Sequence, residues 1–138
     1  MKIMVSACLL GHNCKYNGGN NFNQKLADFL QGHEVVPVCP EGLSGLPTPR
    51  APSEIVNGVV MNAEGLNVDK EFRRGAELAF EQVQKVQPDM IILQSRSPSC
   101  GVNQIYDGSF SKKLIPGHGL FAAKCIDGGF KTVDLEDI

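Results

Sequence analysis

Strand-like and helical segments alternate along this chain, and the alternation constrains the fold more than any other feature. Four apolar segments are predicted as strands, at residues 2–5, 34–38, 90–94 and 130–133. Three segments between them are predicted as helices, at residues 23–30, 69–87 and 120–126. Such alternation is typical of α/β proteins with a parallel sheet. We therefore expect an α/β sandwich in which a small, mostly parallel, Rossmann-like sheet is flanked by helices.

Local signals support several of these elements. Asn23 and Asp69 stand at the start of helical segments and are expected to act as N-caps, because their side chains accept hydrogen bonds from the first turn. Apolar residues then recur at helical spacing along the longest helix, namely Phe72, Ala76, Ala79, Phe80, Val83 and Val86. Asn57-Gly58 predicts a hairpin, since this pair suits a type I′ turn.

The composition narrows the possible partners. We expect one domain over residues 1–138, which is long enough to bury a core. The formal net charge of −2 argues against nucleic-acid binding driven by bulk electrostatics. No segment approaches the roughly 18 to 20 apolar residues that span a bilayer, and the N-terminal segment lacks a signal-peptide cleavage pattern. A cytoplasmic protein without nucleic-acid or membrane partners is therefore expected.

The five cysteines are odd in number and widely spaced, so they make a poor disulfide framework. In a reducing compartment such cysteines are more often catalytic, metal-binding or simply buried. Cys8, Cys39 and Cys100 each follow the carboxyl end of a predicted strand. Ligands of open parallel sheets bind beyond these ends. If the strands are neighbours, three thiols from distant parts of the sequence meet at one edge of the sheet.

Converging thiols suit several kinds of site. Thiolates select zinc, copper(I) or iron–sulfur clusters, but no CxxC pair marks any of them here. A closed zinc site needs a fourth ligand, whereas three cysteines on a four-iron cluster leave one iron open as a Lewis acid. From spacing alone, metal ligation and simple burial both remain open. Cys14, in a polar glycine-rich loop, is expected not to be a ligand, and Cys125 is expected to be a small buried hydrophobe.

Polar residues near these cysteines have a functional and an ordinary interpretation. Glu41 can orient or deprotonate a water, or be a solvated loop acid. Ser97 can bind substrate or relay a proton, or cap the backbone of its Ser-Pro turn, and Ser99 has the same two interpretations. Arg50 can hold an anionic or carbonyl group, or be an ordinary loop residue. His118 is more simply explained as an exposed loop histidine.

Five motifs in order resemble the 2-thiouracil desulfurase family, long described only as a domain of unknown function. They are Val5-Ser6-Ala7-Cys8-Leu9-Leu10-Gly11, Cys39-Pro40-Glu41, Gly45-Leu46-Pro47-Thr48-Pro49-Arg50, Ser97-Pro98-Ser99-Cys100-Gly101 and Ile105-Tyr106-Asp107-Gly108. No single motif is decisive, but together they cover essentially the whole chain. The resemblance is to the short, single-domain form of the family.

The resemblance implies a 4Fe-4S cluster held by Cys8, Cys39 and Cys100, with one open iron and sensitivity to oxygen. It also implies catalytic roles for Glu41 and Ser97. The family activity removes sulfur from thiolated pyrimidine bases such as 2-thiouracil and gives the oxo base and hydrosulfide. We expect a hydrolytic reaction without redox change, because an open iron can act as a Lewis acid.

Two positions depart from the family pattern. Gly117-His118-Gly119-Leu120 stands where an acidic residue between glycines is expected, so the substrate pocket can differ. Cys14 stands where relatives can carry another residue. Two alternatives to the enzyme remain: a non-catalytic thiol protein that binds zinc or undergoes redox change, and a pyrimidine-binding module without chemistry.

Overall fold

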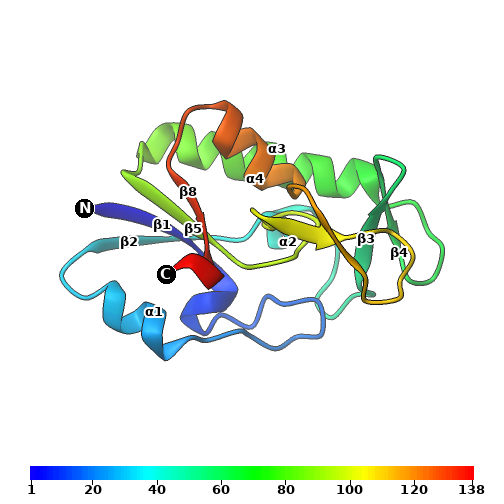
Figure 1. The fold of residues 1–138 in the computed structure, drawn as a ribbon, viewed down its shortest axis with the longest axis horizontal. Coiled ribbons are helices and arrows are strands. Elements are labelled where there is room, and N and C mark those ends of the chain that lie inside the picture. Colours follow the sequence, from blue (N-terminus) through cyan, green and yellow to red (C-terminus); the bar gives the residue numbers. More distant parts are fainter.

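A four-stranded parallel sheet forms the centre of the computed structural model, which describes residues 1–138 (Figure 1). The strand order is β2-β1-β5-β8, with β1 at Lys2–Ser6, β2 at Glu34–Val38, β5 at Met90–Leu93 and β8 at Thr132–Asp134. All three pairings are parallel. The expected α/β sandwich with a small parallel sheet is therefore confirmed. Strand β8 begins two residues later than the predicted 130–133 and carries on to Asp134.

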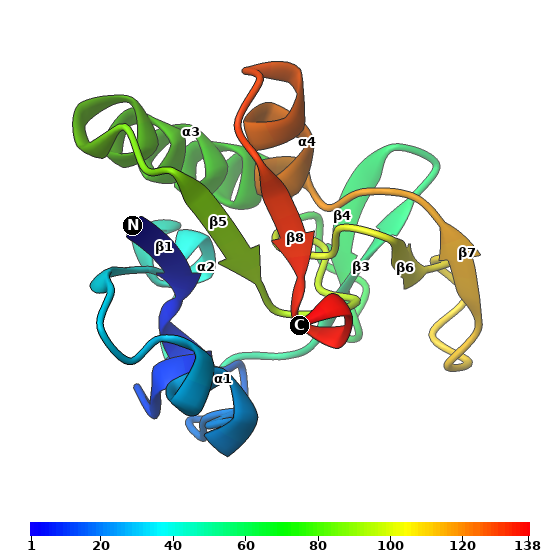
Figure 2. The same cartoon turned by 60° about the vertical axis from the view of Figure 1, so that its left-hand side comes forward.

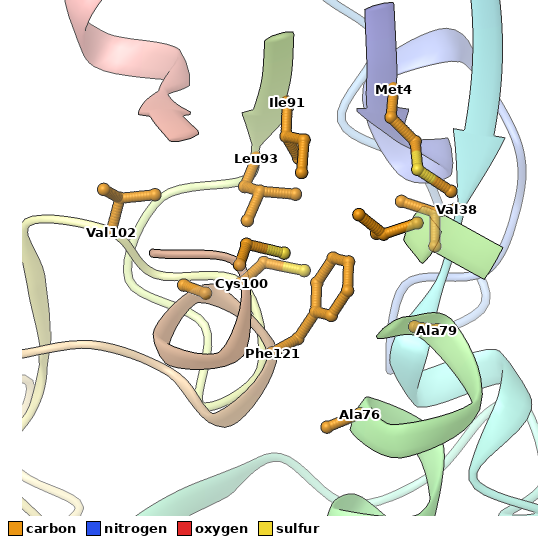
Figure 3. Packing of buried hydrophobic residues seen from close by; sticks show 12 residues of the cluster. Met4, Val38, Ala76, Ala79, Ile91, Leu93, Cys100, Val102 and Phe121 are labelled. Atoms are coloured by element: carbon orange, nitrogen blue, oxygen red, sulfur yellow. The ribbon is translucent and has the colours of Figure 1, made fainter. Parts of the chain in front are cut away.

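Helices cover both faces of the sheet (Figure 1). Helix α1 (Gln24–Phe29) lies on one face, and helices α3 (Asp69–Val86) and α4 (Leu120–Asp127) lie on the other. Alternation along β1 explains this layering, because Ile3 and Val5 pack toward α1 while Met4 packs toward α3 and α4. Figure 3 shows the second of these cores, with the ring of Phe121 between α3 and the sheet.

The helix starts confirm one predicted cap and correct another. The side chain of Asn23 accepts a hydrogen bond from the Leu26 N–H at 2.9 Å, as an N-cap does. Asp69 is not the cap of α3, because Val68 takes that position. The Asp69 carboxylate instead accepts the Val60 N–H at 3.0 Å and so ties the helix start to strand β4.

Two hairpins extend from the sheet (Figure 2). Strands β3 (Ser53–Val56) and β4 (Val59–Asn62) flank the predicted turn, in which Asn57 and Gly58 both have positive φ angles. The second hairpin pairs β6 (Gln104–Tyr106) with β7 (Leu114–Pro116). It is not among the predicted elements, because three-residue strands on either side of a long loop carry almost no periodic pattern.

Short helices follow three of the four parallel strands. The 3-10 helix η1 (Ala7–Leu10) follows β1, and helix α2 (Pro40–Leu43) follows β2. A further 3-10 helix, η2 (Leu135–Asp137), follows β8 at the C-terminus. None of these was predicted, since one helical turn is too short to show helical spacing.

The sheet ends in two open edges, at β2 and β8. Edge strand β2 contains Pro37, which lies opposite Val5 of β1. None of the helices has the length and apolar character that crossing a bilayer requires.

Candidate metal centre

The strand order creates a crevice at the carboxyl end of the sheet. After β1 the chain adds β2 on one side, and it later returns to add β5 on the other side of β1. Such a reversal leaves a gap beyond the carboxyl ends of the two central strands. A cavity of about 690 Å³ lies there, within the range of about 300 to 1,000 Å³ that is usual for ligand sites.

All three predicted ligand cysteines line this cavity. Cys8 lies in η1 after β1, Cys39 follows β2 directly, and Cys100 lies in the turn after β5. Cys100 is buried, with its side chain beside Leu93 and Phe121 (Figure 3), while Cys8 and Cys39 are partly exposed. All five cysteines of the chain are free thiols. The predicted meeting of Cys8, Cys39 and Cys100 at one edge of the sheet is therefore observed.

A fourth thiol, that of Cys14, also lines the cavity, close to both Cys8 and Cys39. The neighbouring Cys14 thiol holds the pKa of Cys8 below its usual value, against the effect of burial. The same thiol, together with burial, raises the pKa of Cys39 far above its usual value. Burial raises the pKa of Cys100 strongly, although a hydrogen bond with Ser6 opposes this. Loading a metal on these thiols must therefore release protons.

Glu41 and Ser97 meet at the wall of the same cavity. The Ser97 hydroxyl donates to Glu41 Oε2 at 3.1 Å, although the two residues belong to the turns after β2 and β5. The other carboxylate oxygen, Oε1, accepts a hydrogen bond from Arg50 Nη2 at 3.1 Å. The pair therefore forms a hydrogen-bonded connection between two of the three cysteine-bearing turns.

The turn that bears Cys100 is built around the Ser97 side chain. Its Oγ accepts the backbone N–H groups of Ser99 at 3.0 Å and Cys100 at 3.1 Å, and its carbonyl accepts the Gly101 N–H at 2.9 Å. Ser97 thus fulfils the ordinary interpretation as a backbone cap while its hydroxyl proton faces Glu41. The start of α4 packs on this turn so closely that a Cβ atom at Gly119 would lie 2.4 Å from the Ser99 carbonyl carbon.

The turn that bears Cys39 is equally confined. The Cys39 sulfur caps α2 by accepting the Gly42 N–H at 3.3 Å. Helix α3 crosses this turn at Gly75, where a Cβ atom would lie 2.1 Å from the Pro40 carbonyl oxygen. The Cys39 and Cys100 turns are therefore held by backbone contacts that leave no room for a side chain.

Other candidates lie outside the cavity. His118 is exposed and bonds the Val102 carbonyl, so the ordinary interpretation of this residue fits. Ser99 is fully buried behind the turn, and its hydroxyl has no hydrogen-bond partner. Cys125 lies on α4 and is part of the apolar core, as expected. The segment Gly117–Leu120, which differs from the family pattern, therefore places no side chain in the cavity wall.

Several cavity residues were not singled out from the sequence. Asn21 approaches the Cys8 sulfur, with 3.8 Å between its Nδ2 and Sγ. Tyr106 and Phe110 of the β6–β7 hairpin form an aromatic part of the wall. Tyr106 belongs to one of the five motifs and Phe110 does not, and it is the unpredicted hairpin that brings both to the cavity.

The donor set suits an iron–sulfur cluster better than a single ion. No three His, Cys, Asp or Glu side chains converge closely enough to hold one metal ion. A cluster of four irons binds each cysteine on a different iron, so its ligands need not converge on one point. Soft thiols from three separate turns around one cavity fit that requirement.

Comparison with known proteins agrees with the sequence motifs. The profile of the 2-thiouracil desulfurase family matches residues 3–137. The chain belongs to the 2-thiouracil desulfurase family. This match confirms the resemblance carried by the five motifs.

Two relatives of this desulfurase family member cover almost the whole chain. The uncharacterized protein YbbK of Bacillus subtilis (strain 168) is 34% identical over an alignment of 149 positions, which covers 99% of this chain and 99% of that one. The solved structure of the [4Fe-4S]-dependent thiouracil desulfidase TudS is 36% identical, with a TM-score of 0.91, and the match covers 99% of this chain and 92% of that one. The fold and the family are thus shared with an iron–sulfur enzyme.

Proposed function

We propose that this protein removes sulfur from thiolated pyrimidine bases of the 2-thiouracil kind and releases the oxo base and hydrosulfide. The observation that carries the proposal is one cavity lined by Cys8, Cys39 and Cys100 together with the Glu41–Ser97 pair. The similarity to the [4Fe-4S]-dependent thiouracil desulfidase TudS supports it. A cavity of about 690 Å³ has room for a cofactor and a single base.

Cys8, Cys39 and Cys100 would hold the cluster, since each comes from a different turn and presents a soft sulfur to the cavity. When bound, a cluster with one iron free of protein ligands supplies a Lewis acid next to the substrate. The chain supplies the proton handling. The reaction consumes one water, places its oxygen on the ring carbon and releases the sulfur as hydrosulfide with one proton, so no electrons are exchanged.

Glu41 is the group that takes the proton from the attacking water. Its carboxylate stands at the cavity wall, with Oε2 on the Ser97 hydroxyl and Oε1 on Arg50. General-base assistance of this kind contributes on the order of 10² to 10⁴ in rate. Each carboxylate oxygen has a second lone pair, which leaves an acceptor position for the water.

Ser97 links Glu41 to the substrate side of the cavity. Two backbone N–H groups point at its Oγ, and these donors stabilise negative charge on that oxygen. With its hydroxyl proton directed at Glu41 Oε2, Ser97 holds the carboxylate that takes the proton from the water.

The direct test is reconstitution of the cluster without oxygen, followed by measurement of sulfide released from 2-thiouracil. We expect sulfide and uracil in equal amounts, together with about four irons per chain. A reconstituted protein that turns over no thiolated pyrimidine, while binding one, would instead support the pyrimidine-binding module.

A thiol redox protein is the second candidate, because Cys14 contacts both Cys8 and Cys39. This role needs a reversible disulfide between Cys14 and one of its neighbours. Mass mapping after treatment with oxidised glutathione distinguishes the two candidates, since an enzyme of the proposed kind needs no such disulfide for turnover.

A further inference from the structure

Arg50 is the one arginine enclosed by the turns around the cavity. Its side chain is 6% exposed, and the Glu41 side chain beside it is 19% exposed. Arginine is almost never buried to this degree unless it is paired. The contact with Glu41, 3.1 Å between Nη2 and Oε1, is its one ion pair.

The remaining bonds of Arg50 fix where its guanidinium stands. Nη2 also donates to the Cys14 carbonyl at 3.0 Å, and Nη1 donates to Thr48 Oγ1 at 2.8 Å. The backbone N–H of Arg50 donates to the Tyr16 carbonyl at 2.7 Å. The planar fork is thus anchored on two segments and presents one donor to the carboxylate.

The Arg50 Nε is buried and has no hydrogen-bond partner. The side chain is aligned so that a terminal nitrogen, and not Nε, meets Glu41.

Glu41 is therefore held from two sides, by Arg50 at Oε1 and by Ser97 at Oε2. A carboxylate with one fixed contact can still rotate about its last bond, whereas two contacts on different oxygens fix its plane. We infer that Arg50 is a positioning residue that fixes the plane of the Glu41 carboxylate for proton transfer. The inference rests on the proposed function, in which Glu41 handles the proton.

A double-mutant cycle on the reconstituted enzyme tests this role, with Arg50→Ala, Glu41→Gln and the double variant. We expect Arg50→Ala to lower kcat on the order of 100-fold while KM changes less than about threefold. In the Glu41→Gln background the same change should lower kcat by less than about threefold, because residues that act through each other are not additive. Iron content per chain is measured for every variant and is expected to stay unchanged.

Two further measurements separate positioning from loop stability. Free guanidinium ion should restore kcat of Arg50→Ala at least about tenfold, and should have no effect in the double variant. Arg50→Lys keeps the charge but not the planar fork, so a loss on the order of tenfold in kcat is expected. If Arg50→Ala does not fold, Arg50→Lys is the variant on which the role of Arg50 is tested. Arg73→Met, which removes an exposed arginine paired with Asp69 at 2.7 Å, is the matched control with unchanged kcat.

The contrary outcomes are distinct. If Arg50→Ala lowers kcat by the same factor in the native and the Glu41→Gln backgrounds, the positioning role is overturned and the proposed function is left intact. A rise in KM without a change in kcat would have the same meaning. Full activity of Glu41→Gln would overturn both, because Arg50 cannot position a carboxylate that the reaction does not need.

Discussion

Cys100 and Cys125 are both buried cysteines of one apolar cluster, yet only Cys100 reaches the cavity. Cys125 lies on α4 among hydrocarbon side chains, and burial alone raises its pKa to about 12. Cys100 lines the cavity, with the Ser6 side chain and the Glu41 carboxylate near it. The difference teaches that the position of a thiol relative to the strand ends, and not its burial, separates a candidate ligand from a core residue.

Removal of the cavity thiols gives the largest expected effect. Each of Cys8→Ala, Cys39→Ala and Cys100→Ala should lose most of the iron and essentially all sulfide release, since three ligands are already the minimum for the proposed cluster. Cys125→Ala should keep both. Iron and acid-labile sulfide analysis after anaerobic reconstitution measures this, and a fully loaded Cys100→Ala protein would erase the distinction between the two cysteines.

Proton handling gives the next largest effect. Glu41→Gln should lower kcat by on the order of 10² to 10⁴, because the amide cannot accept the proton. Ser97→Ala should lower kcat less and also destabilise the fold by about 1 kcal/mol, since two N–H groups lose their acceptor. Steady-state sulfide release and urea unfolding measure both quantities. A normal kcat in Glu41→Gln protein that holds its full iron content would contradict the role of Glu41 as proton acceptor.

The close contact at Gly119 predicts a structural effect at the cavity. Gly119→Ala should lower the free energy of unfolding by about 3 kcal/mol, because the added Cβ would lie 2.4 Å from the Ser99 backbone and the turn cannot move without shifting Cys100. Gly129→Ala is the control. Gly129 has a φ of 83° and open space around it, so only about 1 kcal/mol is expected there. Equal unfolding midpoints for the two variants would show that the turn is not confined.

The pKa of Cys125 predicts a smaller, pH-dependent effect. Its folded value of about 12 exceeds the unfolded value of 9.0, so its contribution to stability is complete below pH 9 and is lost as the pH rises toward 12. The loss is about 1.4 kcal/mol at pH 10. Urea unfolding of the metal-free protein at pH 8 and pH 10, with Cys125→Ala as reference, measures it. An identical pH slope in that variant would contradict the assignment.

The smallest effect is expected for Cys14. Cys14→Ser should keep the iron content and sulfide release of the unaltered protein, since the other three thiols remain. A loss of iron comparable to that of Cys8→Ala would place Cys14 among the ligands and correct the expectation from the sequence.

The sequence predicted the features that depend on local patterns. The alternating segments specified the parallel sheet, and Asn57-Gly58 specified its hairpin. The placement of Cys8, Cys39 and Cys100 after strands was enough to anticipate their meeting, because parallel strands share one carboxyl edge.

The remaining features depend on contacts between distant segments. Nothing near Cys14 in the sequence indicates that its loop folds back between Cys8 and Cys39. The pairing of Arg50 with Glu41 likewise depends on how a proline-rich segment crosses the turn after β2. Asp69 shows the same limit of prediction from local sequence. Its residue type suits an N-cap, but its carboxylate instead accepts the N–H of Val60 in strand β4.

Pro37 on edge strand β2 has a consequence beyond the fold of one molecule. In edge strands the proline nitrogen faces away from the existing ladder and offers no hydrogen to an incoming strand. A second copy that tried to extend the sheet from this edge would lack a donor close to the carboxyl end, and such gaps are a recognised protection against edge-to-edge aggregation. The strand end that leads into Cys39 is thereby kept clear of intermolecular pairing.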